Sequence, residues 1–344
     1  MRNDINRQWL LSNRPEGMIN EGNFRWVEGP IPRVEDGQVL VRNLWLSFDP
    51  TQRPWMSMDT YVPMIPLGEV MRAISVGQVV ESRRADYQPG ELVQGAFGWQ
   101  DYVATDGSGL VPMRKLPPSV PPNLALSLFG ITGLTAYFGV LDVGRIKSGE
   151  TFVVSGAAGA TGSIAGQIAK IKGCKVIGIA GGQAKCEWLK SEVKFDGAID
   201  YRTEDVEARL SALCPEGVDV FFDNVGGPVL DTVLARIRLK ARIVLCGAIS
   251  RYNDAVPAPG PVNYLSLVVQ RARMEGFIVL DYAERFSEAI AELSGWLAAG
   301  KLKQKEDVVL GLETAPITLI HLFTGQNFGK QLLKIADPPL PQVD

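Results

Sequence analysis

The apolar and polar positions of this chain fall into three regions with different patterns. In residues 1–122, short apolar runs alternate with glycine and proline, as in Gln38–Leu46, Gly68–Val80 and Glu91–Gly98. Such runs predict short strands, so we expect a mostly β, barrel-like unit. The proline-rich stretch Leu116–Pro122 ends this region, because proline fits neither a helix interior nor a central strand.

Residues 123–300 alternate between short apolar runs and segments with helical spacing. Thr161–Lys172 carries isoleucines at helical spacing, and Lys185–Lys190 begins another helix. The runs that predict buried strands are Thr151–Ser155, Lys175–Ala180, Gly197–Asp200, Val218–Phe222 and Arg242–Cys246. Strands separated by helices predict an α/β fold with a doubly wound, parallel Rossmann sheet.

After residue 300 the pattern returns to β character. The expected elements are a strand, a helix and a strand at Asp307–Leu310, Pro316–Leu322 and Gln331–Ile335. A chain of 344 residues has room for about two domains. We therefore predict one domain from residues 1–122 and 301–344, and a second, Rossmann domain from residues 123–300.

Composition and charge narrow the class of protein. The net charge of −3, without a basic run, argues against a nucleic-acid surface. The first residues lack the apolar core of a secretory signal, and runs such as Ile243–Ile249 are too short to span a membrane. We expect a soluble, cytoplasmic protein with reduced thiols at all four cysteines, which are Cys174, Cys186, Cys214 and Cys246.

A glycine-rich turn between the first strand and the first helix of the Rossmann region carries the main functional prediction. Residues 153–162 read VVSGAAGATG, which departs from the strict GxGxxG pattern. Small residues still let the backbone approach a pyrophosphate at a helix N-terminus, although a glycine turn of another α/β fold is the alternative. The predicted cofactor-binding residues here are Gly156, Ala158, Gly159, Ala160, Thr161 and Gly162.

The end of the second strand favours NADPH over NADH. NAD-preferring domains place an acid there to hold the ribose hydroxyls. This chain has Gly181 and Gly182 instead, followed by Lys185, while Tyr201 ends the next strand. A lysine without a neighbouring carboxylate attracts a 2′-phosphate; the alternative is that Lys185 is an ordinary solvated lysine.

The chain has few of the histidine and cysteine side chains that bind zinc. A catalytic zinc needs three protein ligands, and a structural zinc commonly needs four cysteines. The chain has one histidine, His321, and no cysteine before Cys174. We therefore predict no metal site, so that hydrogen-bond donors must polarise a substrate carbonyl.

Several motifs together resemble one family over nearly the whole chain. They are Gly68–Arg72, Gly130–Tyr137, Ala157–Gly162, Phe222–Gly227, Cys246–Asn253, Glu275–Val279 and Asn327–Lys330. The chain resembles the zinc-independent medium-chain dehydrogenases/reductases of the prostaglandin reductase, plant double-bond reductase and bacterial curcumin reductase group. The resemblance implies a GroES-like first domain, a Rossmann second domain and a homodimer joined near Met274–Leu280.

The resemblance also implies an activity, which is hydride transfer from NADPH to the β-carbon of an α,β-unsaturated ketone or aldehyde. Lys185 and Tyr201 match positions at the adenosine 2′-phosphate, with Gly182 beside them. The remaining matched cofactor positions lie at the nicotinamide half and are Asn224, Cys246, Gly247, Ala248, Ile249, Ser250, Tyr252, Phe277, Ile278, Val279, Asn327 and Gly329.

Tyr252 is the candidate catalytic residue. Hydride addition to a conjugated carbonyl builds negative charge on the oxygen, and a phenol with a pKa of about 10 stays protonated and donates a hydrogen bond to it. Tyr252 follows a strand end, where functional residues of open α/β sheets lie. A proton path through the nicotinamide ribose hydroxyl or water would leave Tyr252 as a positioning group.

The first domain departs from the family where the substrate enters. The family has Asp-Pro-Tyr-Met-Arg, whereas this chain has Asp-Pro-Thr-Gln-Arg with Thr51 and Gln52 at the changed positions. The candidate substrate-lining residues are Thr51, Trp55 and Tyr61. A quinone reductase is the rival enzyme, and a catalytically weak NADPH-binding sensor or structural protein is the rival of another class.

Overall fold

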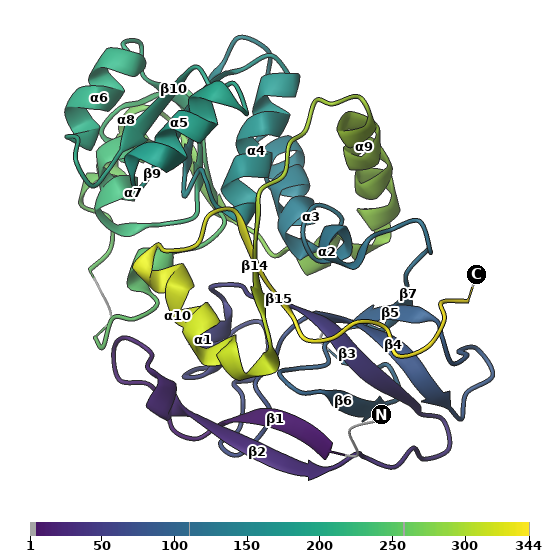
Figure 1. Cartoon of the computed structure of the whole chain (residues 1–344). Coiled ribbons are helices and arrows are strands. Elements are labelled where there is room, and N and C mark those ends of the chain that lie inside the picture. Colours follow the sequence, from purple (N-terminus) through teal and green to yellow (C-terminus); the bar gives the residue numbers. More distant parts are fainter. Residues whose placement is uncertain (1–4, 110, 257–258, 344) are drawn as a thin grey trace. The chain divides into compact units, whose positions relative to one another are not determined.

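The computed structural model describes residues 5–109, 111–256 and 259–343, and they form two compact units (Figure 1). The first comprises Met1–Ser127, Asp307–Gln326 and Gln331–Asp344, and the second comprises Leu128–Glu306 and Asn327–Lys330. The first segment of the first unit ends at Ser127, whereas the sequence pattern predicts a domain boundary after residue 122. Helix α2 (Pro122–Leu126) belongs to the first unit because Gln94 of β5 donates a hydrogen bond to the Ala125 carbonyl.

The second unit is built on a parallel sheet, which confirms the predicted Rossmann fold. Within the described residues the sheet has six strands in the order β10-β9-β8-β11-β12-β13. Numbered within the unit, this is the order 3-2-1-4-5-6, which places a switch point between β8 and β11. The strands are β8 (Thr151–Ser155), β9 (Lys175–Ala180), β10 (Gly197–Asp200), β11 (Val218–Asp223), β12 (Ile237–Leu245) and β13 (Arg273–Gly276).

Helices connect these strands and pack on the sheet. They are α3 (Ile131–Phe138), α4 (Ala160–Ile171), α5 (Gln183–Ser191), α6 (Val206–Leu213), α7 (Gly227–Leu234), α8 (Leu265–Val269) and α9 (Phe286–Ala298). Helix α4 packs on β8 and β9, with α3 against its side (Figure 1). Ile164 and Ile168 of α4 are buried, as their helical spacing predicts, and so are the three residues between them.

One predicted strand in this unit ends earlier than expected. The sequence pattern extends the fifth strand to Cys246, but β12 ends at Leu245. The amides of Cys246 and Gly247 both donate to the carbonyl of Asp223 at the end of β11, at 2.9 and 3.1 Å. The chain therefore turns away from the sheet at Cys246.

The first unit is mainly β. Its elements are β1 (Ile5–Leu11), β2 (Phe24–Pro30), β3 (Val39–Ser47), α1 (Gln52–Trp55), β4 (Ser75–Ser82), β5 (Leu92–Gly95), β6 (Tyr102–Thr105), β7 (Arg114–Lys115), α2, β14 (Glu306–Leu310), α10 (Ala315–Thr324) and β15 (Lys330–Lys334). In the described chain, β1 pairs with β2, and a seven-stranded sheet runs β14-β15-β3-β4-β5-β7 with β6 against β3.

The predicted strand Gly68–Val80 is too long at its start. Strand β4 begins only at Ser75. Gly68 turns the chain with a φ of +86°, and the amide of Met71 donates to Trp9 of β1 instead of joining the large sheet. Met71 is buried in the core of the first unit, so the apolar residues before Ser75 reflect burial and not strand formation.

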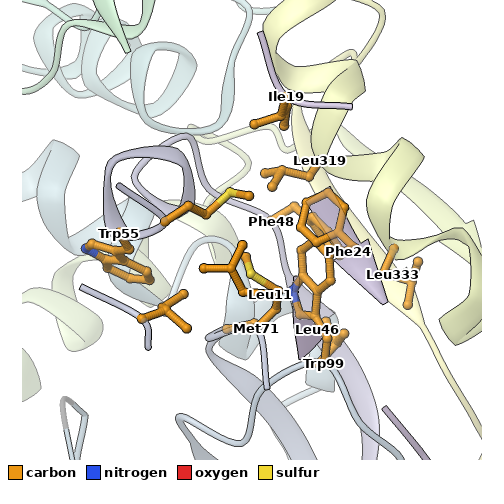
Figure 2. Close-up of a cluster of buried hydrophobic side chains, with 14 of the residues drawn as sticks. Leu11, Ile19, Phe24, Leu46, Phe48, Trp55, Met71, Trp99, Leu319 and Leu333 are labelled. Carbon is orange, nitrogen blue, oxygen red and sulfur yellow. The ribbon is translucent and has the colours of Figure 1, made fainter. Parts of the chain in front are cut away.

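A hydrophobic cluster explains why the C-terminal segment returns to the first unit (Figure 2). Trp99 is fully buried, with ring centroids 5.3 Å from Phe24 and 5.1 Å from Phe48. Leu319 of α10 and Leu333 of β15 complete the same cluster. These leucines would face water if the C-terminal segment lay elsewhere, which favours its return. None of the helices in the described ranges has the length and apolarity that a membrane span requires.

Candidate active site

The glycine-rich turn links β8 to α4 with almost no room for side chains. Gly156 has a φ of +58°, and the amide of Gly159 donates to its carbonyl at 2.9 Å. A Cβ on Gly162 would lie 2.3 Å from that same carbonyl oxygen. The turn therefore requires glycine at these positions, which is the close backbone geometry a pyrophosphate needs.

The start of α4 suits an anion. Its N-cap is Gly159, which has no side chain, so that no side-chain cap competes for the first-turn amides. Residues of the first turn are Ala160, Thr161 and Gly162, and their N–H groups point out of the helix end together with the positive end of its dipole. Ala158, just before the cap, is buried at the base of the turn.

A segment distant in sequence closes on this turn. The amide of Gly329 donates to the carbonyl of Ala158 at 3.0 Å, and Gly329 forms a parallel bridge with Gly159. Gly329 has a φ of +85°, and a Cβ on it would lie 2.0 Å from the carbonyl oxygen of Lys305. The side chain of Asn327 donates to the Gly329 carbonyl at 3.2 Å, so both predicted residues lie at the turn.

A second group of predicted residues gathers after β9. Gly182 adopts a φ of +103° at the start of α5, and its Cβ position faces open space. The amide of Lys185 donates to the Gly182 carbonyl at 3.1 Å. A Cβ on Gly181 would lie 2.8 Å from the hydroxyl of Tyr201, whose ring therefore lies over this turn. Lys185 and Tyr201 thus lie at the same turn as the open Cβ position of Gly182.

Asp200 organises this group, although it is not among the residues predicted from the sequence. Its Oδ1 accepts the amides of Gly182 at 2.8 Å and Arg202 at 3.1 Å. The hydrogen bond from Gly182 is the largest influence that lowers the pKa of Asp200. An acid at the end of the second strand would indicate NAD. Here the acid is Asp200 at the end of the third strand, and its carboxylate accepts backbone amides.

The third group lies where β11 and β12 end. The amide of Asn224 donates to Ser155 Oγ at 2.8 Å, and its Nδ2 donates to the Ser155 carbonyl at 2.7 Å. The amide of Ile249 donates to the Asn224 carbonyl, and Ser250 donates to the Val225 carbonyl through both its amide and its hydroxyl. The loops after the two strands therefore hold each other.

Tyr252 sits directly after the short helix η3 (Ile249–Arg251). Its hydroxyl oxygen accepts the amide of Ala248 at 3.2 Å. A Cβ on Gly247 would lie 3.0 Å from that oxygen, so the close approach depends on glycine. A phenol oxygen that accepts a backbone N–H donates its own O–H more strongly.

The surroundings of Cys246 favour its protonated thiol. Burial, together with the charge of Asp223, raises its pKa to about 12. A thiolate is the reactive form, and this environment disfavours it. All four cysteines are free.

The segment after β13 carries the last predicted residues, Phe277, Ile278 and Val279. Val279 is buried. A Cβ on Gly139 would lie 2.7 Å from the ring of Phe277 and 2.6 Å from that of Phe222. The Phe277 ring therefore packs into the interior of the unit, and Gly139 provides the space for it.

The three candidate substrate-lining residues form one group within the first unit. The hydroxyls of Thr51 and Tyr61 lie 3.4 Å apart, and the rings of Trp55 and Tyr61 meet edge to face at 6.4 Å. Tyr61 is 47% exposed, whereas Trp55 is 4% exposed and belongs to the core. Burial is the largest influence that raises the pKa of Tyr61, and its hydrogen bond with Thr51 opposes it.

The unusual Gln52 has a structural role. It is buried, accepts the amide of Asp49 at 3.1 Å and donates to the carbonyl of Arg72 at 2.8 Å. The guanidinium of Arg72 lies 5.3 Å from the centre of the Trp55 ring. Of the two residues that depart from the family pattern, only Thr51 reaches Tyr61.

Three residues of these groups escaped the sequence analysis: Ser155, Asp200 and Asp223. Each is the last residue of a strand in the parallel sheet. A polar residue that closes an apolar run at the carboxyl end of a parallel strand is the signal that would have found them. In the described ranges, no group of three or more histidines, cysteines or acids is arranged to hold a metal ion.

Comparison with known proteins gives consistent matches. Residues 7–113 match the family model described as N-terminal domain of oxidoreductase, and residues 160–295 match the one described as zinc-binding dehydrogenase. The NADPH-dependent curcumin reductase of Escherichia coli is 41% identical, over 96% of this chain and 97% of that protein. The NADP(+)-dependent 2-alkenal reductase of Nicotiana tabacum is 38% identical, over 96% and 98%. The crystal structure of CurA from Vibrio vulnificus in complex with NADPH has a TM-score of 0.92 and 41% identity, over 96% and 100%.

Proposed function

We propose a function for this chain from the premise that it belongs to the zinc-independent medium-chain dehydrogenase/reductase family. It is an NADPH-dependent oxidoreductase that reduces the carbon–carbon double bond of α,β-unsaturated ketones or aldehydes. The observation that carries the proposal is the joined pair of loops after β11 and β12, which brings Asn224, Gly247 and Tyr252 together beside the glycine-rich turn. Relatives named curcumin reductase and 2-alkenal reductase support this substrate class.

The residues present fit NADPH at both ends. Gly162 leaves no space for a Cβ and Gly156 has a φ of +58°, which suits a backbone pressed against a pyrophosphate. Lys185 and Tyr201 lie at the turn where the Cβ position of Gly182 is open, which suits a 2′-phosphate. A relative with the same fold and 41% sequence identity has been solved with NADPH bound. When bound, NADPH supplies the hydride that the β-carbon receives.

The chain itself must stabilise the negative charge that then develops on the carbonyl oxygen. Its only histidine, His321, and its cysteines, all from Cys174 onward, cannot build a Cys/His zinc site in the first unit. A neutral hydrogen-bond donor is therefore required. Tyr252 is our candidate: its O–H donates toward the substrate oxygen, and the Ala248 amide stabilises the phenol oxygen from behind. The α-carbon gains the proton that completes the saturated carbonyl compound.

A substrate panel tests this function. The purified enzyme is assayed for loss of NADPH absorbance with a short enal, an aryl enone, a long-chain enone and a quinone, and the products are identified by mass spectrometry. We expect saturated carbonyl products from at least one enone or enal. Turnover of the quinone alone would establish the rival quinone reductase. Tight NADPH binding without any turnover would establish a binding protein.

We also propose a homodimer joined through the edge of the Rossmann sheet. Strand β13 closes one edge of that sheet in the described chain. Nearby, α8 and the turn before it expose apolar side chains, among which Val262 is 78% and Val268 is 71% exposed. A second copy that pairs its own β13 would cover this surface. Light scattering after gel filtration should give a dimer for the wild type and a monomer for Val268→Glu; a monomeric wild type would contradict the proposal.

A further inference from the structure

We propose that Asp223, together with Ser155, is the positioning pair that holds the two loops at the nicotinamide end of the site in their working arrangement. The proposal deepens the reductase function proposed above and rests on it. Neither is among the predicted site residues, although Asp223 lies in the motif Phe222–Gly227 and Ser155 in the glycine-rich segment 153–162. Both are completely buried, with 0% of each residue exposed, so they act through other residues and not on the substrate.

The Asp223 carboxylate gathers donors from two strand ends. Its Oδ1 accepts the hydroxyl of Ser155 at 2.7 Å and the amide of Val225 at 3.0 Å. The amide of Gly226 lies 3.1 Å from both carboxylate oxygens. One buried side chain therefore ties the end of β8 to the whole turn that follows β11.

Ser155 links the Asp223 carboxylate to Asn224 through hydrogen bonds. Its hydroxyl donates to Asp223 and accepts the amide of Asn224 at 2.8 Å. Its carbonyl accepts the Asn224 side chain at 2.7 Å. Asn224 is thus oriented by both the hydroxyl and the carbonyl of Ser155.

Hydrogen bonds also connect Asp223 to the loop that carries Tyr252. The backbone carbonyl of Asp223 accepts the amides of Cys246 and Gly247. The next carbonyl, that of Asn224, accepts the amide of Ile249 at 3.2 Å. From there the chain continues through η3 to Tyr252, whose hydroxyl accepts the Ala248 amide. A change at Asp223 therefore propagates to the candidate catalytic phenol through a few hydrogen bonds.

Burying a charged carboxylate costs free energy of desolvation. A neutral side chain with a purely structural role would avoid this cost. Burial is the largest influence and raises the pKa of Asp223, while the Ser155 hydroxyl and the amides of Gly226 and Val225 oppose the rise. Among the ion pairs of the described residues, none involves Asp223. A buried charge that lacks a cation is retained only where its hydrogen bonds compensate for desolvation. Here those bonds all order the site loops.

Two variants test the pair. Asp223→Asn keeps the shape but removes the charge and sets an amide N–H₂ against backbone N–H groups. Ser155→Ala is milder and removes only the hydroxyl that joins Asp223 to Asn224. We expect each to lower kcat about 10-fold, as for the loss of a buried hydrogen bond near a reacting centre, and to raise the primary isotope effect with [4-²H]NADPH.

A binding comparison separates positioning from general damage and requires no turnover. In the proposed binding mode NADPH contacts both ends of the site, whereas 2′,5′-ADP would contact only the adenosine end at Gly182 and Lys185. The variants should weaken NADPH while leaving the Kd of 2′,5′-ADP within about twofold, because the nicotinamide end alone is disturbed. This ratio remains measurable even if the enzyme reduces no enone, so failure of the proposed function and failure of the pair are distinct results.

Asp219→Asn is the matched control, because Asp219 lies on the same strand at its opposite end. Its carboxylate accepts the amide of Thr151 at 2.8 Å and pairs with Arg238 at 3.2 Å. We expect this control to lower the unfolding temperature but to leave kcat, the isotope effect and the two Kd values unchanged. Equal losses of kcat in Asp219→Asn and Asp223→Asn, or parallel weakening of NADPH and 2′,5′-ADP, would overturn the proposal.

Discussion

Gly162→Ala is the sharpest perturbation of the glycine-rich turn. Gly162 lies in the first turn of α4, and its Cβ position is 2.3 Å from the carbonyl oxygen of Gly156 and 3.1 Å from Cα of Ala157. Ordinary contacts begin near 3.4 Å, so the turn or the helix must move by about 1 Å. The atoms in the way are backbone atoms, which cannot rotate aside like a side chain.

The expected cost follows from this geometry. Overpacking in a well-packed region costs about 1–3 kcal/mol, and a clash with backbone on a strained turn belongs at the upper end. A cost of about 3 kcal/mol that falls entirely on the cofactor-bound state corresponds to a roughly 100-fold increase in Kd. The same amount on the free protein would instead lower its stability. The sum of the two effects is the quantity that the structure predicts.

Two measurements determine the two parts separately. NADPH titration followed by fluorescence gives the change in Kd, and urea unfolding of the free protein gives the change in stability. Gly295→Ala in α9 is the control, because its Cβ position faces open space and alanine favours a helix by about 0.5–1 kcal/mol. We expect Gly295→Ala to bind NADPH normally and to be slightly more stable. A Gly162→Ala variant with unchanged Kd and unchanged stability would refute the reasoning.

Four further predictions concern single residues. Lys185→Ala should raise the KM for NADPH at least 10-fold and change that for NADH less than twofold, since only NADPH carries a 2′-phosphate; equal changes would exclude this role. Tyr252→Phe should lower kcat about 10- to 100-fold with the NADPH Kd unchanged, and a normal rate would make the phenol a bystander. Gly247→Ala should lower kcat while 2′,5′-ADP binds normally, because its Cβ would lie 3.0 Å from the Tyr252 hydroxyl; a normal kcat would contradict this contact. Asp101→Asn should flatten the acid limb of stability: burial raises the pKa of Asp101, but the hydrogen bonds and charges of Arg7 and Arg42 outweigh it and leave the pKa lowered. The stabilisation is therefore full above the unfolded pKa of about 4 and is lost as pH falls through the folded value, so parallel wild-type and variant curves of unfolding free energy between pH 3 and 6 would refute it.

Local sequence patterns identified the elements of the Rossmann unit because its strands are buried on both faces and its helices are amphipathic. Lys175–Ala180 and Gly197–Asp200 are β9 and β10 with the predicted bounds. The glycines of the turn were identifiable for the same reason, since backbone conformation is a local property. The predicted strand bounds are wrong where an apolar run begins with a turn, as at Gly68–Ile74, and where a strand end depends on a neighbouring strand, as at Cys246.

The chain alone determined the fold class, the dinucleotide turn and the lack of zinc ligands, because each depends on residue type and short-range spacing. Tertiary structure decided which polar groups meet. Asp200 reaches back to Gly182, Gly329 closes on Ala158, and Asp223 joins three strand ends. These contacts join residues 18 to 171 positions apart or strands that are not consecutive, and only the parallel order of the sheet brings their carboxyl ends to one edge.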